Sequence, residues 1–184
     1  MPDAMIAGAR RSTGLLLIAR LVVGGIFLLA GIDKVIAPGA FADAVRAFHL
    51  LPPALVLPFA FVVPWIELLV GAYLVVGYLC RIAAAGSIAL LGMFVFALIT
   101  SLVSGDTNHA CGCFGSGGGV NGVLSLLEGG QTIGWWDPIR DLILIGMSIL
   151  LFRSGAGTMS VDGLLTRRAV RHVSGVTPAP HLDI

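Results

Sequence analysis

The segment IAAAGSIALLGMFVFALITSLV, residues 82–103, decides the fold class because it carries no charged residue over a length that can cross a bilayer. A membrane-spanning helix needs about 20 predominantly apolar residues. Two further apolar stretches, residues 15–32 and 55–79, precede it, and each contains a single charge, Arg20 in the first and Glu67 in the second. The sequence therefore predicts an all-α integral membrane protein.

A fourth span is predicted to begin at Asp137, although only residues 142–152 of it are uncharged. Asp137 followed by Pro138 is typical of a helix start, with the aspartate as N-cap and proline at the first helical position. Trp135 and Trp136, which precede it, suit an interfacial anchor. We therefore expect a bundle of four transmembrane helices.

The composition of the whole chain agrees with a membrane protein. Of its 184 residues, 57% are hydrophobic and 11% are charged, against about 25% charged in soluble domains. The net charge of +1 leaves no basic surplus for phosphates, so membrane lipid is the expected partner and nucleic acid is excluded. We expect the first apolar stretch to be retained rather than cleaved, because Arg20 interrupts it and no small-residue cleavage site follows.

The basic residues predict the orientation in the cell membrane. With both termini in the cytoplasm, seven arginines lie inside and three basic residues outside, as the positive-inside rule requires. The inside set is Arg10, Arg11, Arg81, Arg153, Arg167, Arg168 and Arg171, and the outside set is Lys34, Arg46 and Arg140. This orientation makes residues 1–13 and 153–184 cytoplasmic tails of a membrane domain over residues 14–152.

A short amphipathic helix is predicted between the first two spans. After Pro38, the apolar residues Phe41, Val45 and Phe48 recur at helical spacing, and two prolines at residues 52–53 end the pattern. The interpretation we favour is an interfacial helix that covers the bundle, and docking of a partner protein is the alternative.

The candidate reactive site is Cys111-Gly112-Cys113, which the predicted orientation places outside the cytoplasm. A disulfide between these cysteines closes a very small ring, and Gly112 removes the side-chain restriction on the turn that the ring needs. Strained, exposed disulfides are the more oxidising and exchangeable kind. We therefore favour thiol-disulfide exchange over a structural role.

Two other interpretations of this segment stay open. His109, Cys111 and Cys113 are three donors that suit copper or zinc, one fewer than the four of a structural zinc site, and His49 is a candidate for the fourth. Alternatively, the cysteines pair with another subunit or are inert.

Arg20 and Glu67 form a second candidate site, because a charged residue inside a membrane helix costs about 2.5 to 3.5 kcal/mol. Counted from the predicted cytoplasmic ends of their helices, Arg20 lies six residues deep and Glu67 twelve, a difference of about 9 Å. A long side chain and helix tilt can close this difference, so we expect an interhelical ion pair. A place for Glu67 on a proton or quinone pathway is the alternative.

Charged pairs also lie at the outer ends of two helices, Asp33-Lys34 and Arg140-Asp141. A nearby cation lowers a thiol pKa and favours the attacking thiolate, so Lys34 and Arg140, with His109, are candidate modulators of the cysteine pair. The interpretation we favour is that these charges are ordinary interfacial anchors, and modulation of the thiols is the alternative.

Several of these residues together resemble the MauE and DoxX-like family of small four-helix membrane proteins, over roughly residues 14–152. They are Arg20 with Gly25 and Gly31 before Asp33-Lys34, then Leu51-Pro52, then Pro64 three residues before Glu67, then Cys111-Gly112-Cys113-Phe114-Gly115. The last segment, between the third and fourth spans, is the most specific and points to the MauE branch.

The resemblance implies a redox-associated maturation factor of methylamine utilisation. It implies that Cys111 and Cys113 are the thiol pair, that an extracytoplasmic thioredoxin-like protein and an exported client are partners, and that Arg20 and Glu67 are the family's intramembrane charges. The protein would be a thiol-disulfide oxidoreductase or an accessory subunit of one, and the residues require no cofactor. A metal-handling protein and a non-catalytic assembly scaffold are the alternatives.

This chain departs from a complete membrane disulfide relay. It has three cysteines, so a second extracytoplasmic pair is lacking, and Cys80 is predicted at the cytoplasmic end of the second span. This argues against a full relay to quinone, while a quinone and a homo-oligomer remain open.

Overall fold

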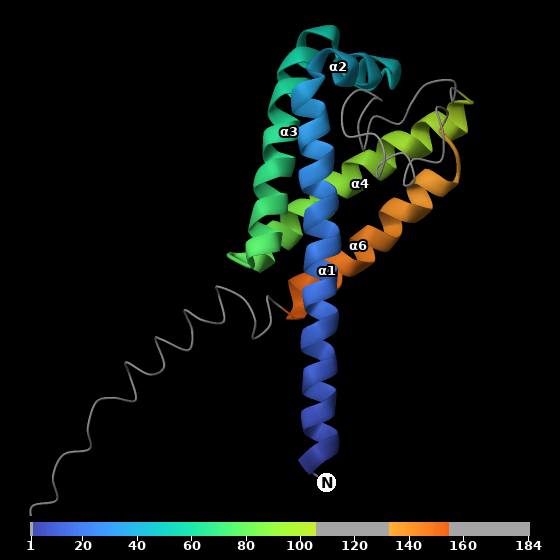
Figure 1. The fold of residues 1–184 in the computed structure, drawn as a ribbon. Coiled ribbons are helices and arrows are strands. Elements are labelled where there is room, and N and C mark those ends of the chain that lie inside the picture. The colour runs from blue at the N-terminus through green and yellow to red at the C-terminus, as the bar shows by residue number, and fades with distance from the viewer. Residues whose placement is uncertain (1, 106–132, 155–184) are drawn as a thin grey trace, which may run out of the picture.

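The computed structural model describes residues 2–105 and 133–154, and in these ranges the chain forms helices and no strand. The helices are α1 (Pro2–Ile36), α2 (Pro38–Ala47), α3 (Pro53–Val76), α4 (Cys80–Ser104) and α6 (Trp136–Ser154) (Figure 1). The all-α prediction is confirmed for this part of the chain.

Four of these helices pack as a bundle of two antiparallel pairs. α1 packs mainly against α3, and α4 packs mainly against α6 (Figure 1). Contacts of α3 with α4 and of α1 with α6 join the pairs. At one end, called here the α2 end, α1 and α4 finish while α3 and α6 begin. The opposite end, called here the Gly77 end, contains the turn between α3 and α4.

Three helices have the length and composition of membrane spans: Gly14–Ile36 of α1, and all of α3 and α4. The chain is therefore a multi-pass helical membrane protein, and three predicted spans are confirmed as helices of that kind. α6 is not among them. Its 19 residues extend for about 28 Å, but four charges, at residues 137, 140, 141 and 153, lie within it. The fourth crossing therefore stays a prediction.

The register of α1 against α3 is set where their backbones approach closely. A Cβ atom on Gly71 would lie 2.8 Å from the carbonyl oxygen of Gly24 and 2.9 Å from the backbone nitrogen of Leu28. About two turns further along α1, a Cβ on Gly31 would lie 2.9 Å from the Cγ atom of Leu68. Small residues at such a crossing let two membrane helices pack at short range.

α2 lies across the end of the bundle that bears its name (Figure 1). Phe41 and Val45 are buried, whereas Asp43 and Arg46 are exposed and form an ion pair of 2.5 Å. The predicted amphipathic helix is thus confirmed, and its apolar face covers the bundle. It ends at Ala47, ahead of the two prolines at residues 52–53.

Candidate functional site

The predicted thiol pair, Cys111 and Cys113, lies in residues 106–132, outside the described residues, and so does His109. In the chain this segment follows α4 and precedes α6, and the adjoining ends of these two helices are at the α2 end. Cys80 is buried at the first residue of α4, which is at the Gly77 end. The cysteine segment and Cys80 therefore join the bundle at opposite ends.

A buried ion pair joins α1 to α3 below α2. The Lys34 Nζ atom donates to both carboxylate oxygens of Glu67, at 2.6 Å and 2.9 Å. Their side chains are 0% and 2% exposed. The ammonium also faces two aromatic rings, with its nitrogen 5.1 Å from the ring centroid of Phe41 and 5.0 Å from that of Phe94. Two carboxylate oxygens and two ring faces thus replace the water that this cation loses.

The expected ion pair between Arg20 and Glu67 is therefore wrong. The close contact of Gly24 with Gly71 places Arg20 level with Leu74 and Val75, about two helical turns beyond Glu67. Estimating depth from the ends of the apolar stretches did not give this register, because backbone contact between two glycines sets it.

Arg20 instead caps the carboxyl end of α3. Its Nε atom donates to the Leu74 carbonyl at 3.0 Å, and its Nη2 atom donates to the Val75 carbonyl at 3.1 Å. These carbonyls are in the last turn of a helix, where no backbone donor follows and the helix dipole favours a cation. Gly77, with φ of 73°, turns the chain beside the guanidinium, and a Cβ atom there would collide with it.

The direction of helical side chains identifies the correct partner of Glu67. Side chains lean toward the N-terminus of their own helix. In the antiparallel pair of α1 and α3, Glu67 therefore leans toward the α2 end and Lys34 leans away from it, so the two converge. Arg20 leans toward the Gly77 end and diverges from Glu67. This signal is present in the sequence once the two helices are paired.

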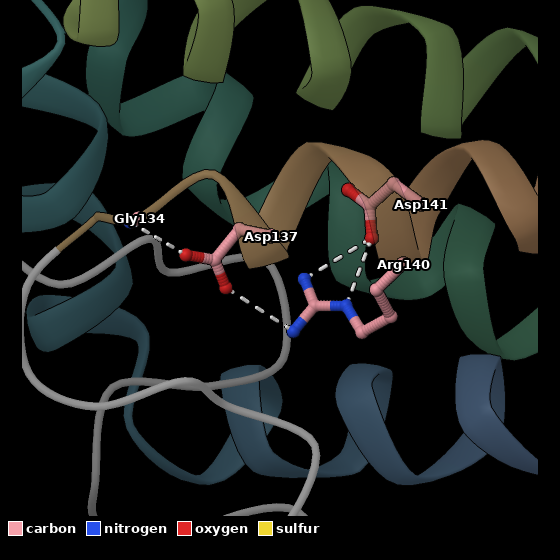
Figure 2. A network of polar contacts seen from close by, with 4 residues as sticks. All are labelled: Gly134, Asp137, Arg140 and Asp141. Carbon is pink, nitrogen blue, oxygen red and sulfur yellow. Dashed lines mark hydrogen bonds and ion pairs between the residues drawn. The ribbon is translucent and has the colours of Figure 1, made fainter.

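A second charged group lies at the start of α6 (Figure 2). The Arg140 guanidinium lies between two carboxylates: its Nη1 atom is 3.4 Å from Asp137 Oδ1, and its Nε and Nη2 atoms each donate to Asp141 Oδ1 at 3.1 Å. Asp137 Oδ2 accepts a 2.9 Å hydrogen bond from the backbone N–H of Gly134. Asp137 thus fixes the entry into α6, which begins at Trp136, one residue before the predicted start.

The charged residues at the α2 end of α1 and α6 are buried within the bundle, which differs from the exposure expected of interfacial anchors. Six charged residues, in the Lys34–Glu67 ion pair, next to it and at the start of α6, are at most 6% exposed: Asp33, Lys34, Glu67, Asp137, Arg140 and Asp141. The bundle encloses them, whereas Trp135 and Trp136, beside them in sequence, are exposed. Lys34 and Arg140, the expected modulators of the cysteine pair, are at the end where the cysteine segment begins and ends, and carboxylates engage both.

Two pockets adjoin the Lys34 ion pair. One, of about 280 Å³, is lined by apolar residues of α2, α3 and α4 that include Phe41 and Phe94, the two rings facing the ammonium. The other, of about 250 Å³, lies between α1 and α3, with Lys34 and Pro64 in its lining. Within residues 2–105 and 133–154, no three His, Cys, Asp or Glu side chains come together as metal ligands.

Comparison with known proteins finds relatives over most of the chain. A family model described as "Methylamine utilisation protein MauE" matches residues 12–154. A protein named "Methylamine utilization protein MauE" from Methylophilus methylotrophus is 32% identical over 152 residues, which are 83% of this chain and 73% of that protein. A protein of the same name from Paracoccus denitrificans is 29% identical over 158 residues, 86% of this chain and 78% of that protein. No solved structure matches the chain.

Proposed function

Since the chain belongs to the MauE family, we propose that it is a membrane accessory protein whose Cys111/Cys113 pair exchanges disulfides with an extracytoplasmic thioredoxin-like protein. The exchange serves the maturation of an exported client, as in the methylamine utilisation for which its relatives are named. One observation carries this proposal: the Cys-Gly-Cys segment is inserted between two helices whose adjoining ends both lie at the α2 end of the bundle.

The chemistry follows the usual course of thiol-disulfide exchange. A thiolate of the partner attacks one sulfur of the Cys111–Cys113 disulfide, and that S–S bond breaks as a mixed disulfide forms. The partner's second thiolate then displaces the bound cysteine. The partner leaves as a disulfide, and Cys111 and Cys113 remain as two thiols that have gained two electrons and two protons. Run in reverse, the same steps reduce the partner.

The proposed orientation places the α2 end outside the cytoplasm. Arg81 and Arg153 meet at the Gly77 end, where the Arg81 Nη2 atom donates to the Arg153 carbonyl at 3.4 Å. Arg10 and Arg11 precede the candidate span of α1 on that same side. This excess of arginine supports a cytoplasmic Gly77 end with both termini inside, provided that α6 crosses the membrane.

Thiol labelling in intact cells tests the proposal. The chain has three cysteines, so a Cys80→Ser variant keeps only the pair of interest and serves as the background. We expect a membrane-impermeant maleimide to label this variant only after mild reduction of the cells. A pair that the reagent reaches only after lysis would refute both the orientation and the exchange reaction.

Single cysteine variants separate exchange from other roles. In the same background, either Cys111→Ser or Cys113→Ser leaves one thiol that cannot close the ring. We expect at least one of these variants to accumulate a mixed disulfide with a thioredoxin-like protein, detected by non-reducing electrophoresis and identified by mass spectrometry. Client maturation that proceeds normally in the Cys111→Ser/Cys113→Ser double variant would instead support an assembly scaffold.

A further inference from the structure

The charged group at the start of α6 contains more carboxylate than cation. Arg140 is shared by Asp137 and Asp141, and all three side chains are at most 7% exposed. One guanidinium balances one carboxylate, so the group carries a net charge of −1 when both aspartates are ionised. Burial of an uncompensated charge is strongly unfavourable.

The two aspartates differ in how their oxygens are engaged. Both oxygens of Asp137 have partners, the Gly134 N–H and the Arg140 guanidinium. In Asp141 both bonds from Arg140 go to Oδ1, and Oδ2 is a buried oxygen that has no hydrogen-bond partner among residues 2–105 and 133–154. Asp141 is 0% exposed, so bulk water does not reach that oxygen. Figure 2 shows this carboxylate with one oxygen toward Arg140 and the other directed away from it.

The surroundings supply little compensating charge. α1 packs against α6 and contributes Asp33 and Lys34 to the surroundings. Lys34 attracts the Asp141 carboxylate electrostatically, but it is paired with Glu67 of α3. The single charged residue of α4, at position 81, is at the opposite end. The cysteine segment, residues 106–132, contains no lysine or arginine. His49, between α2 and α3, is exposed, and the cysteine segment contains one histidine, His109.

We propose that the Asp137–Arg140–Asp141 group is a proton-binding site, with the proton held on Oδ2 of Asp141. A proton neutralises the excess carboxylate and fits an enclosed oxygen, and the described residues contain no cluster of metal ligands beside it. The α2 end therefore takes up one proton at a pH at which exposed carboxyls are ionised. This site does not depend on the proposed thiol exchange.

Infrared difference spectroscopy of the purified full-length protein in lipid nanodiscs tests this site. Spectra at about pH 5.5 are compared with spectra at about pH 8, because ordinary Asp and Glu, with pKa values of about 3.9 and 4.3, are ionised at both. We expect the carbonyl band of a neutral carboxylic acid at the lower pH. It should be absent from Asp141→Asn and unchanged in Asp43→Asn, whose aspartate is exposed in the α2 ion pair.

A second variant keeps the test decisive if Asp141→Asn does not fold. In Asp137→Asn, the Arg140 guanidinium balances the Asp141 carboxylate, so the charge excess within the group disappears and the band should be lost at about pH 5.5. Lack of the band in the unchanged protein, its persistence in Asp141→Asn, or its unaltered presence in Asp137→Asn would each refute the site. None of these measurements involves Cys111 or Cys113, so the outcome is separate from that of the thiol experiments.

Discussion

At the scale of single residues, Lys34 and Glu67 show how this protein holds charge inside a membrane bundle. Each is enclosed, and each has the other as its ionic partner. Removing one member of a buried pair leaves an uncompensated charge, which costs about 3–5 kcal/mol, whereas removing both is far less harmful. The pair therefore makes the packing of α1 on α3 specific even if its net contribution to stability is small.

A double-mutant series measures this coupling. We expect Lys34→Met and Glu67→Gln each to lower the thermal stability and the folded yield strongly, by an amount that corresponds to several kcal/mol, and the double variant to recover part of both. Thermal denaturation in detergent followed by size-exclusion chromatography gives the readout. Arg46→Met, which opens the exposed pair with Asp43, is the control and should have little effect. A double variant whose loss of stability equals the sum of the two single losses would contradict the coupling.

The sequence identified the charged residues of the bundle but assigned Glu67 to the wrong cation. Composition marks Arg20 and Glu67 as unusual, because a charge interrupts an otherwise apolar stretch. The partner depends on helix register and on the direction in which side chains lean, and a backbone contact between Gly24 and Gly71 fixes the register. Burial of the charged residues at helix ends was missed for a similar reason, since it depends on how α6 packs against α1 and α4.

At the scale of helices, the contact of α1 with α3 depends on the absence of side chains at Gly24 and Gly71. Most other neighbours in the core touch through apolar side chains, which can adjust their rotamers. A backbone carbonyl opposite a glycine cannot move without shifting the whole helix. The glycine contact is thus a point at which the bundle cannot adapt by a change of rotamer.

Alanine substitution tests this point. We expect Gly71→Ala to destabilise the protein by about 1–3 kcal/mol, because the added methyl would lie 2.8 Å from the Gly24 carbonyl oxygen. Gly92→Ala in α4, where a Cβ meets nothing within 4 Å, is the control and should be neutral or slightly stabilising. Thermal denaturation of both variants in the same detergent is the measurement. Equal stability of the two variants would show that α1 and α3 can separate without loss.

At the scale of the whole molecule, three spans and the cover formed by α2 were predictable from sequence. The length of an apolar stretch and the helical spacing of apolar residues are properties of a single segment. They can therefore be read from the sequence without knowing how the helices pack. α6 is different, since the charged residues of its first two turns are buried by other helices and a fourth charge, Arg153, lies in its last turn. Its membrane crossing therefore depends on the packed bundle as well as on its own sequence.

Reporter fusions determine whether α6 crosses. We expect alkaline phosphatase to be active when fused after Gly105 and inactive when fused after Ser154, and green fluorescent protein to show the opposite pattern. These outcomes correspond to an extracytoplasmic α2 end and a cytoplasmic C-terminal tail. Active phosphatase at both positions would mean that α6 stays on the outer side, leaving three crossings.

The contacts of Lys34 and Arg20 bear on how the chain is inserted into the membrane during synthesis. The Lys34–Glu67 pair and the Arg20 contacts with Leu74 and Val75 all join α1 to α3, so every residue involved emerges from the ribosome before α4 does. Arg140 likewise binds carboxylates of its own helix. The first hairpin can thus leave the translocon with these charges matched and without waiting for later helices.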